Sequence, residues 1–101
     1  NRHNRERRDA LLSALDEYFA DIAHWTTPHG GLFVWMTLPE HVDAWAMFDD
    51  ALAQNVAYIP GGAFSVNKGH KNTLRLNFSK LPPEQLREGV FRLHQVISKW
   101  L

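Results

Sequence analysis

Apolar residues recur at steps of three and four in three stretches of this chain, a spacing that predicts three amphipathic helices. The first runs from about residue 4 to 23, the second follows the N-cap Asp43 and ends before Asn55, and Pro82 and Pro83 open the third. Gly89, inside the third helix, is expected to mark close packing on a sheet. The predicted buried stripes are Leu11, Leu12, Leu15, Tyr18, Phe19 and Ile22; Ala44, Met47, Phe48, Ala51 and Leu52; and Leu86, Val90, Leu93 and Ile97 with Trp100 or Leu101.

Three other stretches predict β-strands, at residues 32–38, 56–59 and 73–79, and His24 and Trp25 are candidates for a short fourth. Residues 32–38 are apolar on both faces, which indicates either an internal core strand or a strand whose Phe33 and Trp35 pack on a neighbouring domain. Residues 56–59 are closed by a turn of Pro60 and two glycines. In 73–79, alternation puts leucine and phenylalanine on one face and polar residues on the other.

The resulting order of helix, strand, helix, strand, strand, helix predicts an α/β (α+β-like) small domain. We expect a two-layer sandwich, with a three- to four-stranded mixed or antiparallel sheet and helices mainly on one face. A right-handed crossover between the strands at 32–38 and 56–59 would place them on either side of the strand at 73–79, antiparallel to both.

The composition narrows the possible functions. The 101 residues suffice for one domain, and 11 lysines and arginines balance 11 aspartates and glutamates, so no net field favours nucleic acid or membranes. Cysteine is absent, the six histidines share no metal-binding spacing, and no apolar run is long enough to cross a bilayer. We therefore expect a cytoplasmic domain without a metal site.

The first residues indicate that the chain is part of a larger protein. The chain opens at Asn1 and places four arginines within residues 1–8, where a helix that began there would repel them with its own dipole. We therefore interpret 1–101 as a single domain of a larger protein, with 1–23 as a helix continuing from upstream and 24–101 as the αβ part. A basic tail for nucleic acid is the rival interpretation, although Glu6 and Asp9 dilute it.

Arg75 is the main candidate for chemistry, because it lies in an otherwise uncharged strand on the polar face of that strand. A long cation among small polar residues is suited to bind an anion, but a solvent-exposed arginine on an edge strand fits the same periodicity. Other chemistries have little support: Asp49 and Asp50 lie on a helix face that looks solvated, and Ser65 lacks the Gly-x-Ser-x-Gly context of a nucleophile.

Three segments together carry a resemblance that covers essentially the whole chain. They are residues 30–35 (GGLFVW) with Leu38-Pro39, residues 56–64 (VAYIPGGAF) and residues 72–79 (NTLRLNFS). In this order and spacing they resemble the small C-terminal domain of class I and II, fold-type I, pyridoxal-phosphate-dependent aminotransferases. The pattern is most similar to the branch of 2-aminoadipate, aromatic and kynurenine-type aminotransferases and MocR-type regulators. The Pro-Gly-Gly turn departs from the family's commoner Pro-Gly-Ser, and we assign it no contact.

The resemblance implies that Arg75 binds the α-carboxylate of an amino acid or 2-oxo acid, with Gly31 as a backbone position close to the substrate. It implies pyridoxal 5'-phosphate as the cofactor of the full-length parent, held by a large domain upstream whose Schiff-base lysine has no counterpart here. Lys80 stands in the wrong place for that lysine. The fragment is thus expected to be inactive alone and the parent to be a homodimer. The alternatives are an effector-sensing domain of a MocR-type transcription regulator, and a small interaction module that uses Phe33 and Trp35.

Overall fold

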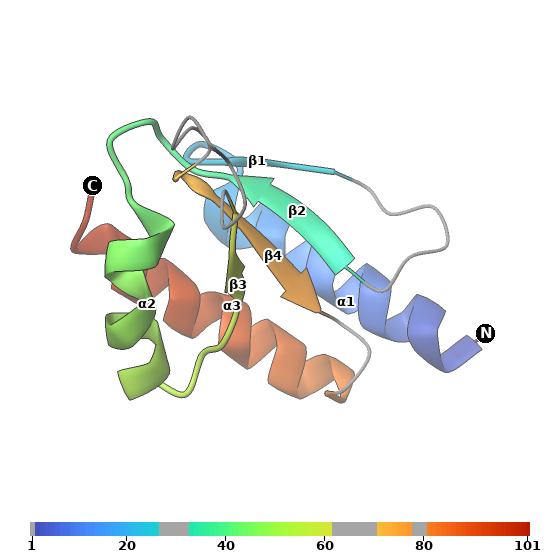
Figure 1. The fold of residues 1–101 in the computed structure, drawn as a ribbon. Helices are drawn as coiled ribbons and strands as arrows, with labels where there is room; N and C mark the ends of the chain where they lie inside the picture. Colours follow the sequence, from blue (N-terminus) through green and yellow to red (C-terminus); the bar gives the residue numbers. More distant parts are fainter. Residues whose placement is uncertain (1, 27–32, 62–70, 78–80) are drawn as a thin grey trace.

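The computed structural model describes residues 2–26, 33–61, 71–77 and 81–101, without the side chains of residues 2–4. This part of the chain contains three helices and a four-stranded sheet (Figure 1). In chain order the elements are α1 (Arg2–Phe19), β1 (His24–Trp25), β2 (Phe33–Thr37), α2 (Ala44–Ala53), β3 (Ile59–Pro60), β4 (Thr73–Asn77) and α3 (Pro83–Ser98). None of the described helices is long and apolar enough to cross a membrane.

The sheet has the strand order β1-β2-β4-β3, and each neighbouring pair is antiparallel. The sequence predicted that β2 and β3 would flank β4 and run antiparallel to it, and the structure confirms this. The candidate short strand at His24 and Trp25 is also confirmed, as a partner of β2. The register sets Trp35 of β2 and Ile59 of β3 on either side of Arg75.

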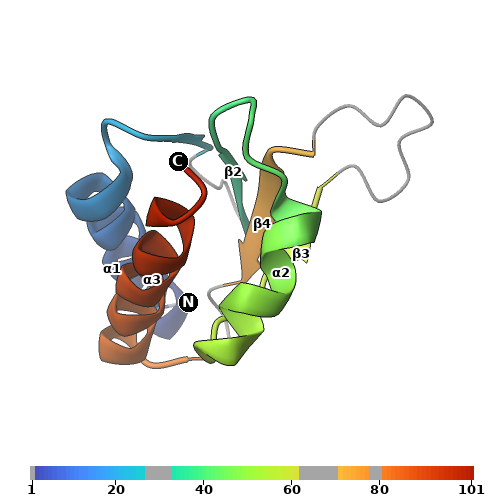
Figure 2. The same cartoon turned by 90° about the vertical axis from the view of Figure 1, so that its left-hand side faces the viewer.

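The core lies between one face of the sheet and helices α1 and α3, which pack against each other on that side, to the left of the sheet in Figure 2. Helix α2 lies beside the β3 edge, so the helices are mainly on one face as predicted. The inner face of the sheet presents buried Val34, Met36, Leu74 and Leu76. The helical residues that bury against them are Leu11, Ala14, Leu15 and Phe19 of α1, Ala44, Met47 and Ala51 of α2, and Leu86, Val90, Leu93, Val96 and Ile97 of α3.

Of the two alternatives for residues 32–38, the internal core strand is wrong, whereas packing of Phe33 and Trp35 on a neighbouring domain stays a prediction. Val34 and Met36 are fully buried, but Trp35 on the opposite face is 49% exposed, because no helix in the described part covers that side. We call this side the outer face of the sheet; its central residues are Phe33, Trp35, Ile59 and Arg75. Since Ile59 is 46% exposed as well, the outer face is partly apolar and open.

Two predicted elements are shorter than expected. Helix α1 ends at Phe19, whose carbonyl accepts from the amides of Ile22 and Ala23 in a closing turn. Strand β3 comprises only Ile59 and Pro60, so the proline belongs to the strand that it was expected to terminate. This position suits proline, because β3 is an edge strand and a missing amide donor there leaves no ladder bond unmade.

Both ends of α2 have the local structure that their residue types predicted. The Asp43 carboxylate accepts from the amides of Trp45 and Ala46, at 2.9 and 3.2 Å, and so caps the helix. Asn55 after the helix has φ of 61° in the left-handed region. The expected burial of Leu52 is wrong: this side chain is 46% exposed, because the buried stripe of α2 is narrower than its apolar sequence.

Tyr58, in the segment before β3, contacts α2 through a hydrogen bond and a ring contact. Its hydroxyl donates to the carbonyl of Ala44 at 2.7 Å, and its ring meets Phe48 edge-on, with centroids 5.3 Å apart. The side chain is buried, and burial, followed by the nearby carboxylates of Asp43 and Asp50, raises the pKa of the phenol above its ordinary value near 10.

Two glycines differ in what surrounds them. A Cβ built on Gly61 would lie 1.8 Å from Thr73 Oγ1 and 3.2 Å from the Thr73 carbonyl oxygen, so the backbone there approaches β4 too closely for a side chain. A Cβ on Gly89 would meet nothing within 4 Å. The prediction that Gly89 allows close packing on the sheet is therefore wrong. It instead borders a hollow of about 80 Å³ between α3 and β4.

Candidate functional site

Arg75 lies in the middle of β4, on the outer face of the sheet and away from the helical core. Its neighbours along β4, Leu74 and Leu76, point inward and are buried. Alternation thus fixes the direction of the arginine, because anchoring the two leucines in the core forces the residue between them outward. The rigid centre of a sheet, rather than a loop, therefore positions this cation.

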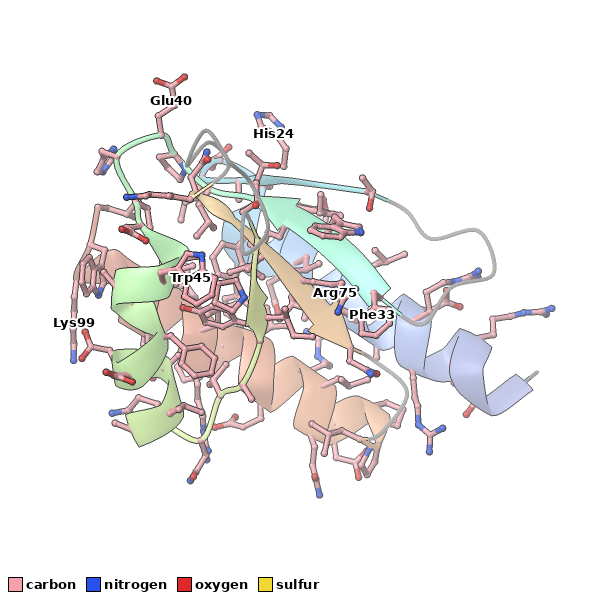
Figure 3. All side chains as sticks on the ribbon, in the orientation of Figure 1. His24, Phe33, Glu40, Trp45, Arg75 and Lys99 are labelled. Atoms are coloured by element: carbon pink, nitrogen blue, oxygen red, sulfur yellow. The ribbon has the colours of Figure 1, made fainter. Side chains whose placement is uncertain are left out.

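The guanidinium of Arg75 lies against two aromatic side chains from β2 (Figure 3). Its Cζ atom is 4.2 Å from the centroid of the Phe33 ring and 5.6 Å from that of Trp35. Both distances are within the range in which a ring's electron-rich face attracts a cation. The arginine is accordingly half-buried although no described helix covers it.

The backbone pairing explains why Trp35 comes so near. The amide and carbonyl of Trp35 both bond to Thr26 on the β1 side, at 3.3 and 2.9 Å. Trp35 and Arg75 are therefore a non-hydrogen-bonded pair of the β2–β4 ladder, the type in which opposite side chains lie closest.

The charge of Arg75 is not neutralised within the described part of the chain. No salt bridge joins it to a described residue, and its Nε atom is shielded from solvent without a hydrogen-bond acceptor there. A buried donor without an acceptor is costly, so such a group usually has a partner that completes it. A carboxylate suits this arginine, because its two oxygens accept parallel hydrogen bonds from the planar guanidinium.

Hydrogen bonds secure the strands around Arg75 at one end of the sheet, where β4 begins and β2 and β3 end. At the start of β4, the Asn72 side chain donates to the carbonyl of Leu38 at 2.6 Å, and the Leu38 amide donates to the Asn72 carbonyl at 2.7 Å. Beyond β3, the amide of Gly61 bonds to the carbonyl of Thr73 at 2.8 Å, and the indole of Trp45 donates to the Gly61 carbonyl at 2.9 Å.

The described residues bring no other predicted group to Arg75. Gly31 lies outside the described residues, as do Lys68 and Lys80. Lys71 and Lys99 are exposed, and Lys99 follows α3 at the left edge of the view, away from Arg75 (Figure 3). The described residues therefore offer no lysine near Arg75 to hold an aldehyde cofactor. Nor do they bring together three His, Asp or Glu side chains in a metal-binding group.

Comparison with known proteins decides the family. The family model for aminotransferase class I and II matches residues 1–93. This chain belongs to the class I and II aminotransferases. Aromatic-amino-acid aminotransferase 1 of Thermococcus litoralis is 50% identical over 92% of the chain, and the 2-aminoadipate transaminase of Thermus thermophilus is 45% identical over 93%. A more distant relative is the HTH-type transcriptional regulator NorG of Staphylococcus aureus, 28% identical over 94%. The chain spans less than a quarter of the length of each: 22%, 24% and 21% respectively.

Solved structures of the family share the fold. The kynurenine aminotransferase of Pyrococcus horikoshii, crystallised with PMP, matches with a TM-score of 0.91 and 41% identity over 99% of this chain and 25% of its own. The multiple substrate aminotransferase of Thermococcus profundus matches with a TM-score of 0.90 and 49% identity over 97% of this chain and 24% of its own. The predicted fold class and the suspected branch of the aminotransferases are both confirmed.

The aromatic setting of Arg75 is the part of the site that sequence reasoning missed. Alternation had already placed Phe33 and Trp35 on one face of their strand and Arg75 on the polar face of another. The missing information was the register, which pairs Trp35 with Arg75. The signal that could have found it is the expected antiparallel pairing of the two strands, since matching their outward faces brings the rings to the cation.

Proposed function

We propose that this chain is the C-terminal, substrate-carboxylate-binding part of a pyridoxal-phosphate-dependent aminotransferase, which transfers an α-amino group between an amino acid and a 2-oxo acid. The observation that carries the proposal is Arg75, a fixed cation on the open outer face whose shielded Nε has no acceptor among the described residues. Membership in the class I and II aminotransferases supports the reaction class.

In this proposal Arg75 binds the substrate's α-carboxylate through two parallel hydrogen bonds, which a lysine cannot reproduce. The strand fixes the backbone of Arg75 and the direction of its side chain, so that the bound amino acid presents its amino group and Cα–H in one orientation to the reacting centre. Gly31 would lie close to the same substrate. The described residues do not fit the cofactor, so a large domain of the same parent would hold it, and the isolated chain would be inactive.

The test is the visible spectrum of the full-length parent before and after addition of each amino acid. A transaminase loses its cofactor aldehyde band and releases a 2-oxo acid with at least one donor. Arg75→Ala removes charge-assisted hydrogen bonds of about 1.5–3 kcal/mol, so it should weaken binding of that donor about ten- to a hundredfold and leave cofactor loading intact. Arg75→Lys should restore little of this affinity.

Arg87 supplies a matched control. It is a second arginine on a structured element, but it lies on α3 and bonds Glu17 at 2.7 Å, on the helical side of the domain. Arg87→Ala should leave the affinity for the donor unchanged. If Arg75→Ala also leaves it unchanged with every donor, the proposed carboxylate site is wrong.

A second candidate rests on the similarity to the regulator NorG. In that case the domain would belong to a MocR-type regulator and sense an effector through the same fold. The spectrum separates the two: a cofactor band that no donor converts, in a parent with an additional DNA-binding domain, favours the regulator. The aminotransferase is the first candidate because the aminotransferase relatives share 45–50% identity with this chain and the regulator shares 28%. We place the aminotransferase parent in the cytoplasm as a homodimer.

A further inference from the structure

The rings of Phe33 and Trp35 on β2 face the guanidinium of Arg75, which we propose binds the substrate carboxylate. Phe33 lies diagonally across from Arg75 in the ladder, paired with Asn77, yet its ring is the nearer one, at 4.2 Å from the Arg75 Cζ atom. Trp35 lies directly opposite Arg75, at 5.6 Å, and is 49% exposed. Figure 3 shows Phe33 and Arg75 together on the outer face.

We infer that Phe33, assisted by Trp35, is a positioning residue that holds the Arg75 guanidinium ready for the substrate carboxylate. The inference rests on the proposed function and adds to it a role for two residues that would not themselves touch the carboxylate. It makes the binding element a unit of three side chains from two strands, which the antiparallel register brings together.

The physical basis is the flexibility of arginine. Its long side chain loses considerable rotamer freedom when the guanidinium is fixed, and a ligand that must order it binds more weakly. Aromatic faces stabilise a cation placed over them, and a planar guanidinium can stack on them as a compact ammonium cannot. Phe33 and Trp35 therefore restrict the guanidinium before a ligand arrives. They do so without accepting its hydrogen bonds, so its donors remain free for a carboxylate.

A purely structural role for the rings makes a different prediction. If Phe33 only filled space on the sheet, its loss would disturb every ligand of the parent alike. If it positions Arg75, its loss affects only ligands that carry the carboxylate. The discriminating pair of probes is the amino acid that the wild-type parent converts fastest and the amine that this amino acid becomes when its carboxylate is removed, such as L-phenylalanine with 2-phenylethylamine.

The experiment measures the dissociation constants of both probes on the full-length parent, from the change in its cofactor spectrum. Phe33→Leu should weaken the amino acid about three- to tenfold and leave the amine unchanged. Trp35→Leu, which alters an exposed side chain outside the core, should weaken the amino acid less, about two- to threefold. Phe33→Tyr keeps the aromatic face and should restore the wild-type value. The conversion rate of bound donor should change less than the affinity, because the rings do not touch the reacting atoms.

Each outcome decides one of the two proposals. Selective weakening of the amino acid by Phe33→Leu, with rescue by Phe33→Tyr, supports the inference. If Arg75→Ala weakens the amino acid selectively but Phe33→Leu and Trp35→Leu do not, the inference is overturned and the proposed carboxylate site stands. Equal weakening of both probes by the ring variants assigns the rings a structural role only. If Arg75→Ala has no effect, or no amino acid is converted, the proposed function fails and the inference fails with it.

Discussion

Replacing Tyr58 with phenylalanine should produce a stability change whose sign depends on pH. The substitution keeps the ring, and with it the edge-on contact with Phe48, but removes the hydroxyl that donates to the Ala44 carbonyl at 2.7 Å. At neutral pH the lost hydrogen bond should lower the free energy of unfolding by about 1 kcal/mol. The side chain is 5% exposed, so water cannot fully replace this bond.

At alkaline pH, loss of the phenol proton makes Tyr58 lower the free energy of unfolding, the opposite of what its hydrogen bond does at neutral pH. Burial raises the pKa of Tyr58 in the folded state, so between pH 10 and this raised value the unfolded chain loses the phenol proton while the folded chain keeps it. The contribution of Tyr58 to stability is therefore complete below pH 10 and falls above it, by about 1.4 kcal/mol per pH unit once the unfolded phenol is ionised. This loss should equal the stabilisation from the hydrogen bond at about pH 10.6, above which the phenylalanine variant is the more stable protein.

The assay is urea unfolding of the wild type and Tyr58→Phe at intervals from pH 7 to 11. The chain contains two tyrosines, so Tyr18→Phe is the matched control: it removes the other phenol and shows how much of the alkaline loss is not due to Tyr58. A difference between wild type and Tyr58→Phe that stays constant from pH 8 to 11 would refute the argument.

The two glycines with contrasting surroundings predict opposite effects of the same substitution. Gly89→Ala should raise the free energy of unfolding by about 0.5–1 kcal/mol, since alanine favours the helix and its methyl group enters open space. Gly61→Ala should lower it by about 1–3 kcal/mol, since the methyl group would collide with Thr73. Urea midpoints of the two variants test both statements, and a destabilised Gly89→Ala would show that α3 packs more closely than described.

Much of the fold could be predicted from the sequence, because its elements carry strong local signals. The stripe of α3, from Leu86 to Ile97, has a clear helical period, and Asp43 marks the start of α2. The antiparallel placement of β2 and β3 around β4 followed from chirality and short connections. The ends of elements carry weaker local signals: Ile22 continues the helical pattern of α1 but lies in the turn beyond it.

What could not be predicted depends on contacts between distant segments. The apolar residue Trp35 left open whether its face packs within this domain or on a neighbouring one, and only the arrangement of the helices shows that no described helix covers it. A glycine in a helix is compatible with both close packing and open space, so the hollow beside Gly89 could not be predicted from the residue type. For the site, alternation directed Arg75 outward, but the stacking on Phe33 depends on a register that single-strand periodicity does not contain.

The edges of the sheet limit how copies of this domain can associate. Both described edge strands, β1 and β3, are two residues long, and β3 contains Pro60, which has no amide hydrogen to donate. Edges this short offer an incoming chain few backbone groups to pair with, and proline interrupts the row. Edge-to-edge polymerisation, the route by which exposed sheets form aggregates, is therefore disfavoured. The domain can therefore expose Trp35 and Ile59 on the outer face of its sheet without also offering edges on which further strands could pair.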